Sequence, residues 1–324
     1  MGPNLPSRSS LIVRQDPMKR PRQPLFALAL SFLTAGIALA AEGDNEGGPG
    51  LSALPEVELK ALSEQDWNPL AGRALAIHPL DWKHGETEHF IYHFVHSYVA
   101  TPISVEAEFN YRLIAKELDL ETMASASGKS HIYIFEKPAD WKAFQVNAHL
   151  EPWTGGIHSF GSLFIVRDPS YKFADHSLGH EIAHLILFRA YQRPLPRWLD
   201  EGFAEYISGL ARASYQRARN YNARPHSQSI PADQLIPLSR LTTMGDYPSS
   251  DQIEIFYHES ERLVRFLAAA DPVAFRALLD SIARGEAFDT AFSRHYAGRF
   301  FDVDALEKQF VPYASKDGKV AALE

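Results

Sequence analysis

The amino-acid sequence predicts an α+β fold in which a small sheet comes first and helices follow. Segments rich in aromatic and β-branched residues lie before residue 170, and amphipathic helical patterns dominate the remainder. The chain has 324 residues, 45% of them hydrophobic, which is enough to build a large core. No internal repeat is visible, so we expect one globular domain over residues 67–324.

The first 40 residues have the order of an N-terminal extension, 1–17, followed by a secretory signal peptide. From Met18 a basic stretch precedes the largely apolar residues 25–40, which end on the small-residue pattern ALA at 38–40. We expect cleavage near Ala40 and a periplasmic or secreted protein. An uncleaved membrane anchor is the alternative. The apolar run is short for crossing a bilayer, so no stable membrane span is expected after cleavage.

The acidic balance and the absence of cysteine restrict the partners and the compartment. The formal net charge is −8 although residues 1–40 are basic, so the rest of the chain is more acidic than this value suggests. We therefore expect neither nucleic acid nor an anionic membrane as a partner. Without cysteine the chain has no disulfide and no thiolate metal ligand, which fits the bacterial periplasm or exterior. The oligomeric state stays open.

The N-terminal half predicts a linker and a few strands. Residues 41–66 begin with the acidic, glycine-rich run AEGDNEGGPG, and we expect a disordered linker there. Three runs rich in aromatic and β-branched residues predict strands: 89–95, 131–136 and 161–168. The glycines of WTGGIHSFG, just before the third strand, suggest a turn. One face of a helix is marked by Val105, Phe109 and Leu113.

The second half predicts helices with recognisable ends. Two helices are expected around residues 177–192, SLGHEIAHLILFRAYQ, and are separated by the proline-containing QRPLPRW. Further on, Asp271 has the character of a helix N-cap with proline at the next position, and Gly285 is placed to end that helix. A last helix carries Leu306 and Phe310 on its apolar face.

Residues 180–184 carry two histidines four positions apart, with a glutamate after the first. Residues four apart on a helix lie one above the other, so His180 and His184 can reach the same metal ion. Glu181 points to the neighbouring face, where a carboxylate can take a proton from a metal-bound water. The alternative is an ordinary amphipathic helix. The flanking run LILF looks buried, however, and buried histidine and glutamate side chains need partners, of which a metal is the simplest.

The segment RWLDEGFAEY, residues 197–206, carries a family resemblance. A metzincin would place a glycine and a third histidine soon after His184, but Leu187 and Ala190 occupy those positions. Instead, the segment resembles the signature of the gluzincins, and exported proteins of the peptidase MA-like kind are more similar still. This resemblance implies a zinc metallopeptidase with a small mixed sheet packed on the helix of residues 180–184 and a mostly helical C-terminal half.

The resemblance also implies roles for individual residues. It makes Glu201 the third ligand of Zn2+ beside His180 and His184, with Glu181 as the general base on the zinc-bound water. Glu205, one turn beyond Glu201, would hold a ligand histidine, although it can also be read as a solvated helix residue.

Two more features follow from the resemblance, each with a structural alternative. Tyr257 would stabilise the oxyanion of a tetrahedral intermediate, or else pack in the core. The strand GSLFIV, 161–166, stands where gluzincins have an edge strand that pairs with substrate, but it can also be an ordinary core strand. Three other histidines lack ligand spacing and are expected to be structural or on the surface: His89, His93 and His158.

The implied activity is zinc-dependent hydrolysis of peptide bonds in a peptide or protein substrate by an exported enzyme. The resemblance covers roughly residues 89–313 but is specific only over 177–206. The interval between His184 and Glu201 is slightly short for an aminopeptidase, and the Gly-x-Met-x-Asn loop that reads a free substrate amine is missing. Endopeptidase and exopeptidase activity therefore both stay open. The alternative function is a non-catalytic metallopeptidase-like module that binds peptide or cell-wall material.

Overall fold

The structure is a computed structural model that describes four parts of the chain: residues 53–118, 128–167, 176–219 and 230–316. The predicted extension, the signal peptide and the first part of the predicted linker, residues 41–52, lie outside these parts. No helix in the described parts is long and apolar enough to cross a membrane.

Five strands in the described parts form one mixed sheet: Lys83–Glu86 (β1), Phe90–Phe94 (β2), Ser130–Phe135 (β3), Gly156–Ser159 (β4) and Ser162–Val166 (β5). Their order is β1-β2-β3-β5-β4. Strands β2, β3 and β5 run parallel to one another, whereas β1 and β4 run antiparallel to their neighbours. The predicted small mixed sheet is confirmed.

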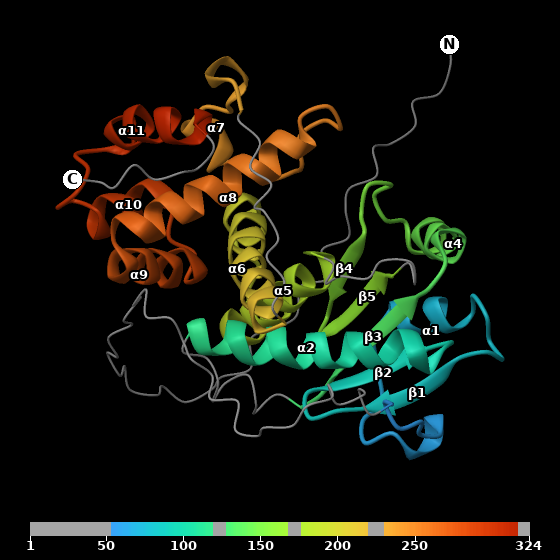
Figure 1. Cartoon of the computed structure of the whole chain (residues 1–324). Coiled ribbons are helices and arrows are strands. Elements are labelled where there is room, and N and C mark those ends of the chain that lie inside the picture. Colours follow the sequence, from blue (N-terminus) through green and yellow to red (C-terminus); the bar gives the residue numbers. More distant parts are fainter. Residues whose placement is uncertain (1–52, 119–127, 168–175, 220–229, 317–324) are drawn as a thin grey trace, which may run out of the picture.

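The helices follow the expected distribution, with most of them after the sheet. They are Pro69–Leu75 (α1), Ser97–Glu117 (α2), Pro138–Ala148 (α4), His176–Tyr191 (α5), Arg197–Ala218 (α6), Leu238–Leu241 (α7), Ile253–Ala270 (α8), Pro272–Ala283 (α9), Phe288–His295 (α10) and Val303–Ser315 (α11). Figure 1 shows the sheet on one side of the molecule, helices α8 to α11 on the other, and α5 and α6 between them. The α+β class with a mostly helical C-terminal half is therefore confirmed.

The central strands β2, β3 and β5 are almost wholly buried on both faces, which explains why the sequence marks them as runs rich in aromatic and β-branched residues. Alternate residues of a strand point to opposite faces. In β3, Ile132 and Ile134 belong to the main core with α2 and α5, whereas Tyr133 and Phe135 belong to a smaller core with α1 and α4. Helix α5 thus lies directly on the sheet (Figure 1).

The edge of the sheet beside α5 is β4 and not β5. Of the two readings that the sequence left open for residues 161–166, the structure shows the core strand and not the edge strand, because β5 pairs on both sides, with β3 and with β4. The segment read as a turn, residues 153–161, contains the strand β4, and only its last two residues form the turn. Phe160 and Gly161 both have positive φ, 43° and 88°, as a two-residue hairpin turn requires.

Residues 53–66 pack on the domain, although the sequence assigned them to the linker. Leu54 is buried in the main core, and its backbone N–H donates to Thr101 Oγ1 at 3.0 Å. Val57 forms a β-bridge with His84 of β1. The acidic, glycine-rich composition that suggested a linker belongs to the start of the segment, whereas these apolar residues follow it.

Gly202 brings the second half of the domain against α6. A Cβ at this position would collide with the backbone carbonyl of Ser260, so only glycine permits this approach of α6 to α8.

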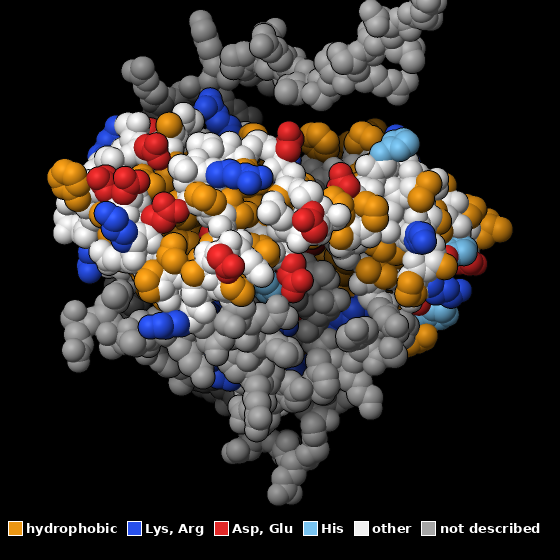
Figure 2. All heavy atoms as spheres, turned by 90° about the horizontal axis from the view of Figure 1, so that it is seen from above, with side chains coloured by type: hydrophobic (Ala, Val, Ile, Leu, Met, Phe, Trp, Pro, Cys, Tyr) orange, Lys and Arg blue, Asp and Glu red, His pale blue; other side chains and the backbone are white. Residues whose placement is uncertain are grey.

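Helix α9 then begins as predicted, because the Asp271 side chain accepts a hydrogen bond from the Ala274 N–H at 2.9 Å. Viewed from above, acidic and basic side chains are interspersed over the described surface (Figure 2).

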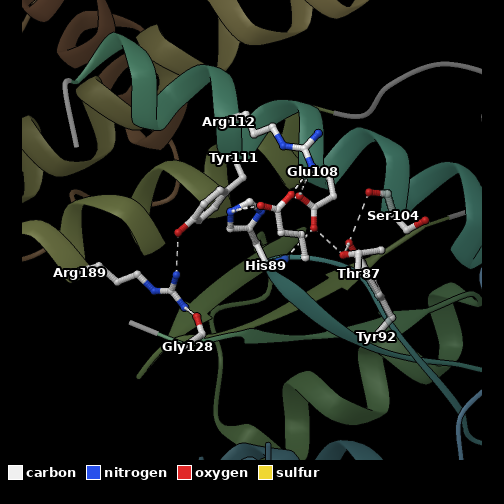
Figure 3. Close-up of polar contacts among 10 residues, drawn as sticks. Thr87, His89, Tyr92, Ser104, Glu108, Tyr111, Arg112, Gly128 and Arg189 are labelled. Atoms are coloured by element: carbon white, nitrogen blue, oxygen red, sulfur yellow. Dashed lines mark hydrogen bonds and ion pairs between the residues drawn. The ribbon is translucent and has the colours of Figure 1, made fainter. Parts of the chain in front are cut away.

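A polar network fixes the C-terminal end of α5. Figure 3 shows Arg189 pointing to the hydroxyl of Tyr111 on α2 and to the carbonyl of Gly128, with bonds of 2.8 and 2.9 Å. The Tyr111 ring packs on His89, whose Nδ1 lies 2.7 Å from a carboxylate oxygen of Glu108. His89 therefore has a structural role, as expected.

Candidate metal centre and active-site cleft

Three side chains from α5 and α6 converge on one point. His180 Nε2 lies 3.2 Å from Glu201 Oε2, and His184 Nε2 lies 3.0 Å from His180 Nε2 and 3.4 Å from the same glutamate oxygen. Three ligand atoms held about 2.1 Å from a tetrahedral zinc ion are about 3.4 Å apart, so separations of this size fit such an ion. The structure thus brings together the three residues that the sequence suggested as ligands.

Each imidazole has a carboxylate next to its Nδ1 atom, while its Nε2 atom faces the shared point. Glu205 Oε1 lies 3.1 Å from Nδ1 of His180, and Asp200 Oδ1 lies 3.0 Å from Nδ1 of His184. A carboxylate at Nδ1 places the ring proton there and leaves the lone pair of Nε2 directed at the shared point. Glu205 therefore contacts the histidine suggested for it. Asp200 was missed, because nothing in the residue order shows that it faces α5.

The charges around the two histidines favour a cation. Burial opposes protonation of His184, but Asp200 and Glu201 raise its pKa well above the usual value. Burial likewise opposes ionisation of Glu201, yet His184 and His180 hold its pKa well below the usual range. The carboxylates that attract protons to these imidazoles would equally attract a divalent metal ion. The donor set of two histidines and one carboxylate therefore fits zinc in both spacing and charge.

Glu181 lies beside this point, between α5 and the edge strand. Its side chain is buried, and burial raises its pKa, which the charges of His180 and His184 oppose. A Cβ on Gly156 of β4 would come within 3.0 Å of Glu181 Oε1. The glycine therefore gives the carboxylate room against the strand, which explains one of the glycines that had suggested a turn.

Two tyrosines, Tyr247 and Tyr257, also lie close to the candidate ligands. The Tyr247 hydroxyl donates to Glu201 Oε1, and the Arg197 guanidinium lies over the Tyr247 ring, 4.0 Å from its centroid. The Tyr257 ring is centred 6.2 Å from that of Tyr247 and 6.4 Å from that of His180. Burial, followed by the charge of Glu201, raises the pKa of Tyr257, so its hydroxyl keeps its proton. Tyr247 was missed because it lies in an irregular segment without spacing signals.

A cleft of about 490 Å³ opens onto these side chains. Its walls include β4, the loop between α5 and α6, and both tyrosines. His158 of β4 lines the cleft, and burial, followed by the charge of His184, lowers its pKa to about 3, so it stays neutral. Tyr257 lines the cleft and also packs against the main core, so its position is compatible with both roles that the sequence left open, oxyanion stabilisation and core packing.

A second group of potential metal ligands is already neutralised. Glu88, His89 and Glu108 offer ligand atoms within 4.8 Å of one another. Arg112, however, lies 2.7 Å from the Glu88 carboxylate and 3.4 Å from that of Glu108. Figure 3 shows Arg112 next to Glu108. A cation there would have to displace the guanidinium, so the group between α5 and α6 is the better candidate.

Comparison with known families matches residues 114–315 to the Peptidase MA superfamily. The match covers more than half of the chain and includes α5, α6 and α8, which carry the residues described above. The chain belongs to this superfamily, and the resemblance found in the sequence is confirmed. Membership indicates a peptidase-like hydrolase domain. A comparison with curated proteins finds no match.

Proposed function

We propose that the protein is a zinc metallopeptidase of the gluzincin type that hydrolyses peptide bonds. The observation that carries this proposal is the convergence of His180, His184 and Glu201 at ligand spacing, with Glu181 beside them in a cleft. Two imidazoles and one carboxylate, without any thiolate, form a donor set typical of catalytic zinc, in which a further position stays open.

The residues of the chain have separate tasks in this reaction. Bound zinc would polarise the scissile carbonyl and make a nearby water more acidic. Glu181 accepts a proton as the water oxygen bonds to the carbonyl carbon, and it returns that proton to the amine as the C–N bond breaks. Tyr257, which stays protonated, donates a hydrogen bond to the developing oxyanion.

The edge strand β4 provides a binding mode for an extended peptide. One side of β4 pairs with β5, and residues 156–159 of β4 line the cleft. A substrate can add as a further strand on the other side, where β4 pairs with no strand of the described parts of the chain. Such pairing supplies main-chain hydrogen bonds without demanding a particular side chain. Peptide or protein is therefore the proposed substrate class.

Export is part of the proposal and rests on the residue order of 18–40. If a bacterium expresses the full chain, N-terminal sequencing of the periplasmic or secreted fraction should find a start at or near Ala41. An intact leader in the membrane fraction would instead indicate an anchored protein.

The activity is tested with a mixed peptide library and cleavage read by mass spectrometry. The purified protein loaded with zinc should cleave peptides, and the same protein stripped by a chelator should not until zinc is restored. A loaded protein that binds peptides from the library but leaves all of them intact would favour the non-catalytic module.

A further inference from the structure

Two cations share the active-site cleft with the candidate zinc centre. Arg193 and Arg197 lie on either side of residues 194–196, between α5 and α6, and both line the cleft. In the described parts of the chain neither of them forms an ion pair with a carboxylate. Because an arginine side chain stays protonated in proteins, both bring a full positive charge to the cleft.

The acidic side chains that line the cleft all belong to the candidate zinc centre. Glu201 supplies a ligand oxygen, Asp200 lies 3.0 Å from Nδ1 of His184, and Glu181 lies beside the metal point. Asp200 follows Arg197 by one turn of α6, yet its carboxylate contacts His184 and not the guanidinium. The two arginines are therefore the charged side chains of the cleft to which the proposed reaction assigns no task.

The ring of Tyr247 holds Arg197 in place. The guanidinium carbon of Arg197 lies 4.0 Å from the centre of that ring, and its Nε donates to the carbonyl of Gly245 at 3.4 Å. The Tyr247 ring is itself contacted edge-on by Trp153 and Phe256, whose ring centroids lie 6.4 and 6.0 Å away. A planar guanidinium that is already stacked loses little freedom when it binds a ligand.

The stacked guanidinium keeps its terminal N–H groups available. The bond from Nε is the one hydrogen bond that the Arg197 side chain makes in the described structure, so its terminal nitrogens have no acceptor there. The residue is half-buried and lines the cleft. The paired N–H groups of a guanidinium match the two oxygens of a carboxylate, with which they form parallel hydrogen bonds.

Tyr247 also connects Arg197 to the zinc centre. Its hydroxyl donates to Glu201 Oε1 and its face carries the guanidinium, so the guanidinium lies one aromatic ring away from a candidate metal ligand. Consecutive residues of an extended peptide advance by about 3.3–3.6 Å. A carboxylate bound at Arg197 would therefore belong to a residue within a few positions of the cleaved bond.

We propose that Arg197 binds a carboxylate of the substrate and thereby determines which peptides are cleaved. Two substrate groups have this chemistry: the free C-terminal carboxylate of a peptide, and an acidic side chain close to the cleaved bond. The first would make the protein an exopeptidase that acts from the C-terminus, and the second an endopeptidase with an acidic preference. Arg193 adds positive charge to the same cleft. The inference rests on the proposed peptidase function, because it assigns a substrate contact in the same cleft.

The first arm of the experiment tests the terminal carboxylate. A peptide that the zinc-loaded protein cleaves is shortened so that it ends one, two or three residues beyond the cleaved bond. Each length is made as the free acid and as the C-terminal amide. If the terminal carboxylate is the ligand, KM should be about tenfold lower for the acid than for the amide at one of these lengths, with a smaller change in kcat.

The second arm tests an acidic side chain. A longer peptide with an amidated C-terminus carries a single glutamate at each position within three residues of the cleaved bond, and a matched series carries glutamine. A KM about tenfold lower for glutamate at one position would identify the side chain as the ligand. Because the amide removes the terminal charge, the two arms distinguish the two sources of the carboxylate.

The variant Arg197→Gln tests whether either preference arises at Arg197. The ratio of KM between the two members of a matched pair should shrink from about tenfold to less than about threefold, because the charge and the paired donors are lost. Arg240→Gln is the control. Arg240 is exposed on α7 and does not line the cleft, so this variant should keep the full preference.

Zinc content and Tm are measured on each variant, because Arg197 also contacts Tyr247. Should Arg197→Gln lose zinc, Arg197→Lys provides the comparison. Lysine retains the charge without the planar fork, so the preference should be reduced but not abolished. A preference as strong in a zinc-loaded Arg197 variant as in the parent would overturn the assignment.

Binding of peptides labelled at the N-terminus, measured by fluorescence anisotropy, separates failure of this site from failure of the activity. Equal KM and equal binding within every matched pair of the parent would overturn the role of Arg197. If no peptide is cleaved, library peptides are compared as free acids and as amides. Tighter binding of the acids that is lost in Arg197→Gln would then mean that the proposed peptidase activity is wrong and the carboxylate site stands.

Discussion

Asp200 Oδ1 lies 3.0 Å from Nδ1 of His184, so the residue directly before Glu201 holds the histidine that shares a metal point with Glu201. One turn of α6 therefore presents both a candidate ligand and the group that orients another. Replacing Asp200 by alanine should lower zinc affinity about 10- to 100-fold, because the His184 ring loses its fixed orientation. Asp200→Asn should lose less, since an amide oxygen can still accept the Nδ1 proton. Competition with a chelator measures both, and unchanged affinity in Asp200→Ala would show that the contact is unimportant.

Glu201 and Glu205 should differ sharply when each is replaced by alanine. Glu201 Oε2 lies within 3.4 Å of both Nε2 atoms, whereas Glu205 lies 3.1 Å from Nδ1 of His180, on the other edge of that ring. After mild chelation, Glu201→Ala should therefore be largely free of zinc, while Glu205→Ala should retain metal at saturating zinc and turn over more slowly. Atomic absorption gives the zinc content. The reverse order would move the ligand one turn along α6.

Local periodicity explains what the sequence could predict of this site. The positions of His180 and His184 on one helix face follow from helix geometry alone, and the family signature supplied Glu201. The order of the strands could not be read in the same way, because pairing between β4 and β5 depends on residues that only the folded sheet brings together. The role of Tyr247 was not predicted for a similar reason, since its contact with Glu201 joins segments 46 residues apart.

Tyr257→Phe should separate catalysis from packing. If the hydroxyl donates to the oxyanion, kcat should fall about 100- to 1,000-fold, because the ring remains but the donor is gone. Zinc content and Tm should stay close to those of the parent, since Tyr257 also packs against the core through its ring. A kcat within twofold of the parent would leave Tyr257 with the packing role alone.

Glu259 on α8, which does not line the cleft, should make the free energy of unfolding depend on pH. Burial is the main cause that raises its pKa to about 8, and its Oε1 lacks a hydrogen-bond partner in the described structure. Between about pH 4.5 and pH 8 the unfolded chain releases a proton that the folded chain keeps, so this group lowers stability as pH rises through that window.

Glu259→Gln should therefore be more stable than the parent at pH 9, by up to about 5 kcal/mol, and the difference should shrink towards pH 5. The glutamine oxygen can still accept the Ile236 N–H that Glu259 binds at 2.8 Å. Urea unfolding at several pH values measures the effect. The exposed Glu254→Gln on the same helix is the control and should show no comparable trend. A constant difference across the pH range would mean that Glu259 is ionised in the folded chain.

The most direct test of the central claim compares the parent with Glu181→Gln, both loaded with zinc, on one peptide that the parent cleaves. Glutamine keeps the size of the side chain but cannot accept the proton of the attacking water. The account predicts that the variant keeps its zinc, its Tm and its affinity for the peptide, while kcat falls by at least about 1,000-fold. Equal turnover by the zinc-loaded parent and variant would contradict it.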